Sequence, residues 1–342
     1  MFFLNPPEQK GAKSFVSLSQ SEKHPNLHLI HHGLFFPYKL KFKLPVLFHF
    51  LMRFHIVRIL KRIGRTVDIV WSFDIGYLYP LSFFPKSCYK VFHPVDEPLN
   101  VGAIKAAKSA NIIFSVTEEI LNKYHRYHAP RYFINHGVSD NFLLATPERF
   151  VLGAKVKIGI SGNFLRPDID RVTLLQIIAE NANCQFDCWG SYTSLQSNIG
   201  GGEDPETADF IQRLKESSNV TLHGALPPSQ LAIAMRTVDA FLICYDVEKD
   251  QSKGTNYHKV IEYLSAGRVI VANNITTYAK MPELVQMVNE RNNQNLPHLF
   301  KSVISNLEEH NNELLCMNRF RFAQMNSYKK QVERIEAAIN TA

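Results

Sequence analysis

The stretch Gly254-Thr-Asn-Tyr-His-Lys-Val-Ile-Glu-Tyr-Leu-Ser-Ala-Gly-Arg-Val-Ile-Val-Ala272 predicts a helix followed by a buried strand. Gly267 is typical of the residue that ends a helix. The β-branched run at 269–271 is typical of a buried strand. The helix has apolar residues at the spacing of one packed face, at Val260, Ile261 and Leu264.

A further strand and a long loop precede this helix. Residues 239–245 read as the strand and residues 246–256 as the loop. This order places Lys259 and Glu262 near the start of the helix. A helix N-terminus and a cation suit a phosphate, and a carboxylate can accept both hydroxyl protons of a sugar diol. The alternative is an ordinary amphipathic helix with both charges in solvent.

The same stretch resembles the nucleotide-sugar site of GT-B glycosyltransferases, most closely the retaining, family 1/4-like branch that builds bacterial cell-surface polysaccharides. The signature of that branch, TN-x-x-K-x-x-E-Y-L-A-x-G, is matched at Thr255, Asn256, Lys259, Glu262, Tyr263, Leu264 and Gly267. The resemblance implies that Glu262 holds the donor ribose and that Lys259 and the 255–256 loop bind the diphosphate. Many retaining relatives carry a second Glu where this chain has Gly254, so the role of that Glu cannot be carried over.

Length and composition indicate a two-domain globular protein. The chain has 342 residues, of which 45% are apolar. Its five scattered cysteines favour reduced thiols and a cytoplasmic location, and their spacing does not indicate a zinc site. We expect no signal peptide and no membrane-spanning helix, because no uncharged apolar stretch reaches the required length of about 18 residues.

The positive charge is concentrated in one segment. The net charge is +7, and residues 39–65 hold eight Lys and Arg and no Asp or Glu. Apolar residues alternate with these cations, as in a basic amphipathic helix that contacts an anionic membrane. The alternative is a core-packing helix with a solvated basic rim. Nucleic acid is a weaker candidate partner, because no nucleic-acid module is recognisable.

Both halves alternate short strands with helices, which predicts parallel α/β sheets. The expected fold class is therefore α/β, and the resemblance to GT-B enzymes implies two Rossmann-like domains that face a central cleft. We expect an N-terminal acceptor domain at 1–150, a donor domain at 151–327, and a last helix at 328–342 that crosses back. Residues 131–142 resemble the GT-B segment N-G-V-D-x-x-F, with His136 at the Asn position. Residues 7–26 leave little room for the usual first helix.

Strand ends in the second half supply further donor-site candidates. Gly162 and Asn163 follow a strand and resemble the loop that meets the diphosphate, and Arg166 and Arg171 are the nearest cations. The triplet Asp168-Ile-Asp170 spells D-x-D, a metal motif in other glycosyltransferases, but its place at a helix start favours capping. The remaining strand-end candidates, all expected to bind the donor, are Gly190, Gly224 and Tyr245.

The first half supplies acceptor-side candidates. His93 and Asp96 follow a strand, and either could orient or deprotonate an acceptor hydroxyl; the alternative is an ordinary loop with capping acids. With Lys259 as the third catalytic candidate, the resemblance implies a glycosyltransferase without metal or cofactor. It would transfer a sugar from a nucleotide sugar to a surface polysaccharide or lipid-linked glycan, on the inner membrane face if the basic helix binds there. The alternatives are a GT-B sugar-nucleotide epimerase and a non-catalytic nucleotide-sugar binder.

Overall fold

The computed structural model describes residues 1–8, 15–98, 100–193 and 204–341. The chain divides into two compact units: Met1–Ser115 with Ile120–Phe133, and Val116–Glu119 with Ile134–Thr341. The second unit thus begins before residue 150, where the sequence analysis placed the boundary. The reason is that residues 134–150 pack on it: Val138 N–H donates to Asn326 O at 2.9 Å, and Phe142 lies in its core. Ala342, the end of the expected last helix, lies outside the described residues.

The first unit contains two sheets. One has the order β1-β3-β2, and the other is the parallel sheet β4-β5-β6-β7. The strands are β1 (Phe2–Leu4), β2 (Val16–Gln20), β3 (His28–His32), β4 (Ile69–Ser72), β5 (Tyr89–Phe92), β6 (Ile112–Ser115) and β7 (Arg131–Phe133). The parallel sheet β4-β5-β6-β7 agrees with the predicted α/β fold class.

The strand β2 was not predicted, and it pairs antiparallel with β3. It occupies part of the region where GT-B proteins usually have their first helix; residues 9–14 of that region lie outside the described part. Antiparallel pairing needs no helical crossover, so a short connection suffices here.

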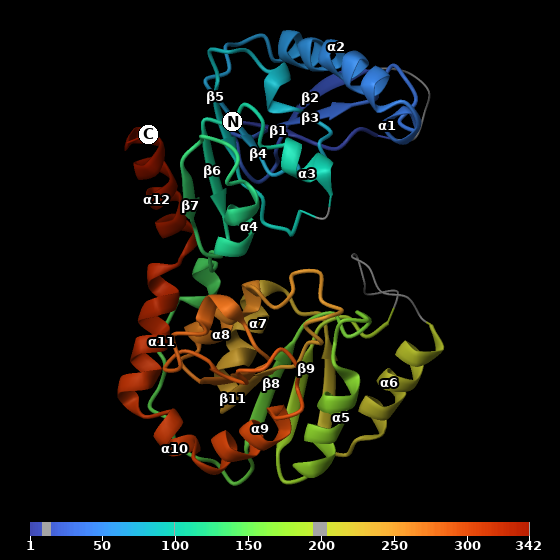
Figure 1. Ribbon diagram of the computed structural model, residues 1–342. Helices are drawn as coiled ribbons and strands as arrows, with labels where there is room; N and C mark the ends of the chain where they lie inside the picture. Colours follow the sequence, from blue (N-terminus) through green and yellow to red (C-terminus); the bar gives the residue numbers. More distant parts are fainter. Residues whose placement is uncertain (9–14, 99, 194–203, 342) are drawn as a thin grey trace. The chain divides into compact units, whose positions relative to one another are not determined.

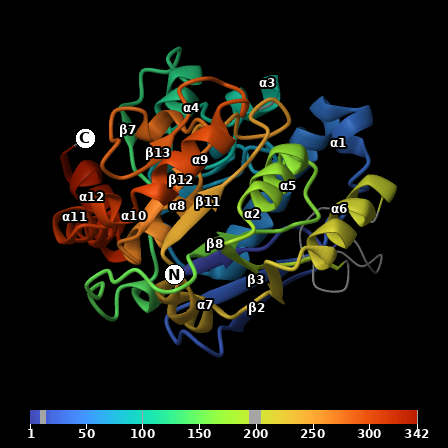
Figure 2. The ribbon, with the colours of Figure 1, turned by 90° about the horizontal axis from the view of Figure 1, so that it is seen from below.

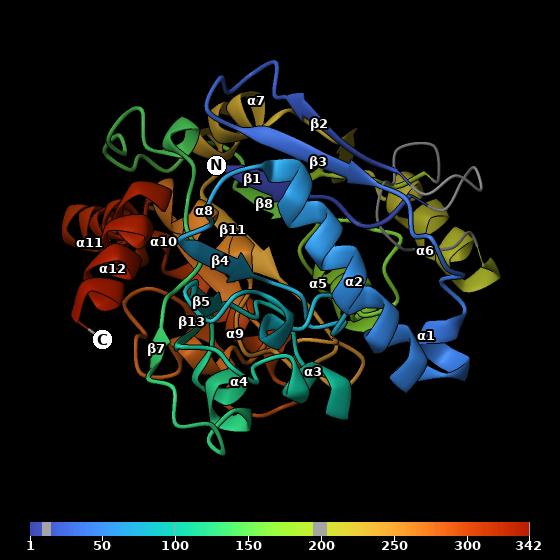
Figure 3. The same ribbon diagram turned by 90° about the horizontal axis from the view of Figure 1, so that it is seen from above.

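The helices of the first unit are α1 (Leu40–Lys43), α2 (Pro45–Ile63), α3 (Val101–Lys105) and α4 (Glu118–Lys123), whose first two residues are assigned to the second unit. Pro45 begins α2 and Gly64, at φ +66°, ends it, as the sequence predicts. The helix lies against the β1-β3-β2 sheet (Figure 3). The buried His55 ring of α2 contacts the His32 ring of β3.

The second unit is built on one six-stranded parallel sheet with the order β10-β9-β8-β11-β12-β13 (Figure 1). Its strands are β8 (Lys157–Ser161), β9 (Gln185–Trp189), β10 (Val220–Gly224), β11 (Ala240–Ile243), β12 (Val269–Ala272) and β13 (Gln286–Met287). In Figure 2 the strands β8, β11, β12 and β13 follow one another across this unit.

Helices cover both faces of this sheet. Every residue of β11 and β12 is therefore buried, whichever face its side chain is on. One face packs on α5 (Arg171–Glu180), α6 (Pro205–Glu216) and α9 (Leu296–Ser305). The other packs on α7 (Pro228–Ala234), α8 (His258–Ser265) and α11 (Glu313–Met325). The chain also forms α10 (Leu307–His310) and α12 (Tyr328–Thr341). Of the described helices, none is long and apolar enough to span a bilayer.

Candidate functional site

Three glycines line the carboxyl edge of the six-stranded sheet. Gly162 follows β8, Gly190 follows β9 and Gly224 ends β10, and all three have positive φ. Gly190 N–H donates to Gly224 O at 2.8 Å, and a Cβ on Gly190 would overlap the Gly162 carbonyl. Ligands of open α/β sheets bind at this edge, outside the carboxyl ends of the strands.

Lys259 extends from α8 over this edge. A Cβ on Gly162 would come within 2.8 Å of the Lys259 ammonium. The ammonium donates to Ser161 O and, at 2.5 Å, to Tyr245 Oη, and it lies 4.8 Å from the Tyr245 ring centroid. A small pocket between the ends of β8 and β11 opens beside it. These contacts use two of the three ammonium donors, so one N–H is available to a ligand oxygen.

The ammonium group keeps its charge despite its surroundings. Burial acts to lower the pKa of Lys259, but Tyr245 and Tyr263 outweigh this effect and raise the pKa above the ordinary value. Tyr263 in turn fixes the strand end, because its hydroxyl accepts from Ser161 N–H at 2.7 Å. The result is a fixed positive charge at the sheet edge.

The N-terminus of α8 adds to this positive charge. Its first residue is His258, and no described side chain caps this end of the helix. Uncapped first-turn N–H groups and the helix dipole attract an anion. The start of α5 differs, because the Asp170 side chain accepts from Thr173 N–H at 3.1 Å and Thr173 Oγ1 at 2.8 Å. This confirms the predicted cap, and it means that the N–H of Thr173 in the first turn of α5 already has a partner.

Glu262 lies one turn beyond His258 on α8. Its carboxylate is 3.4 Å from His258 Nδ1, and its side chain is 17% exposed. Burial raises the pKa of Glu262, while His258 and Lys259 act to lower it. The other ring nitrogen of His258 lies 3.1 Å from both Gly137 O and Tyr328 Oη. The carboxylate therefore sits on an ordered frame and is still reachable from solvent.

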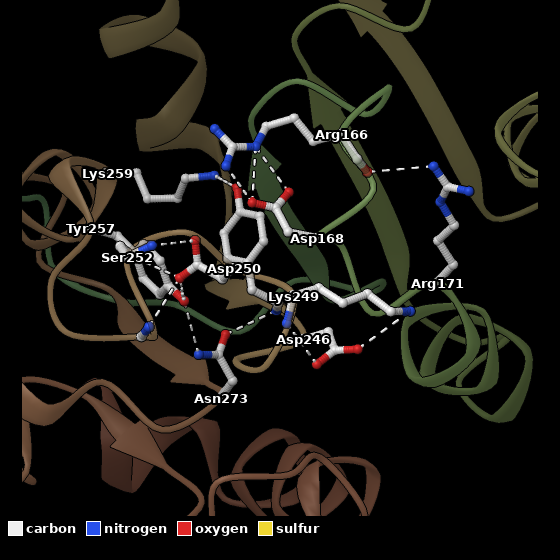
Figure 4. Close-up of polar contacts among 12 residues, drawn as sticks. Arg166, Asp168, Arg171, Asp246, Lys249, Asp250, Ser252, Tyr257, Lys259 and Asn273 are labelled. Carbon is white, nitrogen blue, oxygen red and sulfur yellow. Dashed lines mark hydrogen bonds and ion pairs between the residues drawn. The ribbon is translucent and has the colours of Figure 1, made fainter. Parts of the chain in front are cut away.

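The two arginines near Gly162 differ in whether their guanidinium groups can contact a ligand. Arg166 Nε donates to both carboxylate oxygens of Asp168, at 2.9 and 3.0 Å, while its side chain stays 43% exposed. Figure 4 shows Lys259 extending toward this pair. Arg171 is directed to α6 instead, with its guanidinium 2.7 Å from Thr207 Oγ1 and 3.4 Å from Glu206. Arg166 thus remains a candidate ligand for a diphosphate, and Arg171 does not.

The 255–256 loop uses its side chains within the protein. Thr255 Oγ1 donates to Ser252 O at 2.8 Å. The Asn256 amide donates to Val116 O and to Asn135 Oδ1, both at 2.9 Å. Both residues are buried, so their observed role is to hold the loop.

A buried carboxylate that the sequence analysis missed organises the same loop. Asp250 Oδ2 accepts from Tyr257 Oη at 2.8 Å, from Ser252 Oγ at 2.5 Å and from Gly254 N–H at 3.0 Å (Figure 4). Burial, together with the neighbouring Asp250, raises the pKa of Tyr257. No local sequence pattern predicts this network. The partners of Asp250 are a backbone N–H and two hydroxyl groups, which are common in any loop.

Comparison with solved structures identifies the architecture. No family model and no curated protein sequence matches the chain. The structure is similar over its whole length to sucrose-phosphate synthase of Thermosynechococcus elongatus, with a TM-score of 0.68, 12% identity and 88% of that chain covered. It is similar to Anabaena HepE in complex with UDP, with a TM-score of 0.61, 12% identity and 80% and 79% of the two chains covered. A glycosyltransferase from Rickettsia africae gives a TM-score of 0.62, 14% identity and coverages of 91% and 84%.

The chain has the GT-B fold. The expected fold class is therefore confirmed, and the sheet edge formed by the three glycines and Lys259 belongs to the second unit. At these identities the likeness concerns the fold, so the chemistry is argued from the residues.

Gly254 is required by the backbone of this GT-B chain. It has φ +64°, and a Cβ there would lie 2.7 Å from Asn274 O and 3.1 Å from Val247 Cγ1. The loop therefore does not accommodate the Glu that many retaining GT-B enzymes carry in the matching position.

In the first GT-B unit, His93 is buried and Asp96 is exposed. The His93 ring stacks on Trp71 and Phe73 at centroid distances of 5.9 and 5.2 Å, and burial lowers its pKa to about 4. Neither of its ring nitrogens has a partner among the described residues. These observations favour a packing role for His93 and leave Asp96 as the accessible acceptor-side candidate.

The part of the chain that the structure describes contains no group of three His, Cys, Asp or Glu side chains placed to hold a metal ion. Asp168 and Asp170 of the D-x-D triplet are engaged with Arg166 and with the α5 cap.

Proposed function

We propose that this protein is a glycosyltransferase that takes a sugar from a nucleotide-sugar donor. One observation carries the proposal: the charged Lys259 ammonium lies over a glycine-lined sheet edge, beside the uncapped start of α8. Backbone without side chains allows a diphosphate to approach closely, and the two positive groups match its charge. HepE, of the same fold, has been crystallised with UDP and with UDP-glucose.

The same groups supply a catalytic effect. Breaking the bond between the sugar and the diphosphate builds negative charge on the leaving oxygen. Lys259, the α8 N-terminus and the exposed part of Arg166 are fixed donors for that charge, and preorganised donors of this kind give the largest usual contribution to rate. Glu262 is proposed to accept hydrogen bonds from the two ribose hydroxyls, because its carboxylate is ordered and reachable. Thr255 and Asn256 contribute by shaping the loop.

On the acceptor side we propose Asp96 as the group that orients an acceptor hydroxyl, with His93 packing behind it. The acceptor class we propose is a surface polysaccharide or a lipid-linked glycan, and the stereochemical outcome retention. Both rest on the likeness of residues 255–267 to the polysaccharide branch.

The experiment is a thermal-shift screen with UDP, GDP, ADP and TDP sugars, followed by product analysis of the sugar that binds. Sugar transferred to an added glycan acceptor, or donor hydrolysis with release of the nucleoside diphosphate, supports the proposal. Isomerised donor would indicate an epimerase. No stabilisation by any nucleotide sugar would contradict the site.

Gly254 favours one alternative, a non-catalytic nucleotide-sugar binder, because a group that retaining relatives use is missing. Binding that survives in full while neither transfer nor hydrolysis is detected would support this alternative. The two proposals share the donor site and differ only in turnover.

A further inference from the structure

The helix α2 has two apolar faces, and the fold uses only one of them. The inner face is completely buried and packs against Phe36 and Leu78. Its residues recur at helical spacing, at Phe48, Met52, Ile56 and Ile59. Phe48, which the sequence alone could have placed on either face, belongs to this core.

The outer face carries large apolar side chains in solvent. Val46 is 84% exposed, Phe50 59% and Phe54 51%, and Phe42 of α1 is 75% exposed. Spacings of three and four residues place Val46, Phe50, Phe54 and Val57 on one side of α2. The Phe50 and Phe54 rings pack edge to face with centroids 5.1 Å apart. A contiguous exposed ridge of this kind marks an interaction surface.

Cations surround this ridge and are not neutralised. Lys39, Lys43, Arg53, Lys61, Arg62 and Arg65 form no ion pair with any residue that the structure describes. Lys41 lies 6.0 Å from the Phe42 ring centroid. Since the segment contains no acid, every charge it presents is positive.

We propose that α1 and α2 form a docking surface for an anionic lipid bilayer, with Phe42, Val46, Phe50 and Phe54 inserted at the level of the headgroups. Apolar insertion combined with flanking cations is what an interfacial helix requires. A second copy of the chain fits less well, because a two-fold interface would bring each cation against the cations of its partner. Nucleic acid fits less well, because exposed Val and Phe on a helix contribute nothing to phosphate contacts.

The inference does not depend on sugar transfer, so its test uses no nucleotide. Full-length protein is sedimented with vesicles of neutral phosphatidylcholine and with vesicles containing 30% phosphatidylglycerol, at low and at physiological salt. We expect binding to the anionic vesicles that weakens with salt, because charge attraction is screened. Each cation near the surface contributes about fivefold to partitioning.

Two paired variants separate the contributions. F50S with F54S removes apolar insertion and should weaken binding at least tenfold at both salt concentrations. K61E with R62E reverses two charges and should weaken binding to the anionic vesicles by at least about 25-fold, the loss expected from two cations. The matched controls lie in the second unit: V172S with I233S exchanges exposed apolar residues, and K280E with K301E reverses exposed charges. Neither control should change binding, and circular dichroism checks that every variant is folded.

Equal binding of wild type and F50S/F54S would overturn the insertion surface. Absence of binding to anionic vesicles at low salt would overturn the whole proposal. A concentration-dependent dimer in analytical ultracentrifugation that F50S/F54S abolishes, without vesicle binding, would assign the ridge to a second copy instead. A negative result in any of these vesicle or dimer experiments does not affect the donor-site proposal, because the donor site is tested separately by nucleotide binding.

Discussion

Replacing His93 by Phe should make the first unit less sensitive to acid. His93 is buried among the rings of Trp71, Phe73 and Phe114, and neither ring nitrogen has a hydrogen-bond partner among the residues that the structure describes. An apolar ring fits these surroundings and removes two unpaired buried polar atoms, so at pH 7 the variant should be as stable as the wild type or more stable by about 1 kcal/mol.

The effect of pH has a definite sign. Burial lowers the pKa of His93 from 6.5 to about 4. Below pH 6.5 the unfolded chain takes up a proton that the folded state refuses, so stability present above pH 6.5 is lost as the pH falls toward 4. The loss approaches about 3 kcal/mol and is already about 2 kcal/mol at pH 5. The variant lacks this contribution, although His55, whose pKa burial also lowers to about 4, still titrates.

The measurement is urea unfolding at pH 7 and pH 5, followed by tryptophan fluorescence. The chain has two tryptophans, so a W189F background leaves Trp71, in contact with His93, as the reporter of the first unit. The difference in unfolding free energy between the two pH values should shrink by about 2 kcal/mol in H93F. The control H24N exchanges an exposed histidine and should not change it. An unchanged difference in H93F would refute the reasoning.

Three further outcomes follow from the second unit. G254E should destabilise the protein and gain no activity, because φ is +64° and the new Cβ meets Asn274 O; a rise in turnover would show that the loop adapts. Chelator should leave turnover unchanged, because the D-x-D triplet at Asp168 is engaged in an ion pair and a helix cap; loss with chelator and rescue by manganese would contradict the proposed chemistry. E262Q should weaken nucleotide binding by about 1.5–3 kcal/mol in calorimetric titration, and equal affinity would remove Glu262 from the site.

The sequence was informative where structure is specified locally. The β-branched run of β12 and the helix-ending Gly267 lie next to each other in the chain, so pattern alone predicts α8 and β12. The strand β2 (Val16–Gln20) was missed because it is stabilised by pairing with β3, which the local sequence does not show. Its alternating Ser residues are also typical of a loop. Strand pairing of this kind depends on distant residues and not on local propensity.

The site was predictable only in its charged groups. Lys259 and Glu262 carry a recognisable spacing, but the role of Asn256 depends on Val116 and Asn135, which are 140 and 121 residues away. The sequence likewise shows a basic apolar helix at 45–63 without telling which face is buried, because residues on both faces are apolar. Burial of Phe48 and exposure of Phe50 settle that point.

The central claim concerns Lys259, and calorimetric titration of the K259M variant tests it most directly. Met keeps the length of the side chain and removes the charge. The ligand is the nucleoside diphosphate whose sugar gives the largest thermal shift with wild type, and K280M is the control for an exposed lysine. The account predicts a loss of about 1.5–3 kcal/mol in K259M, which is about 10- to 150-fold in affinity, and no change in K280M. Wild-type affinity in a folded K259M protein would contradict the account.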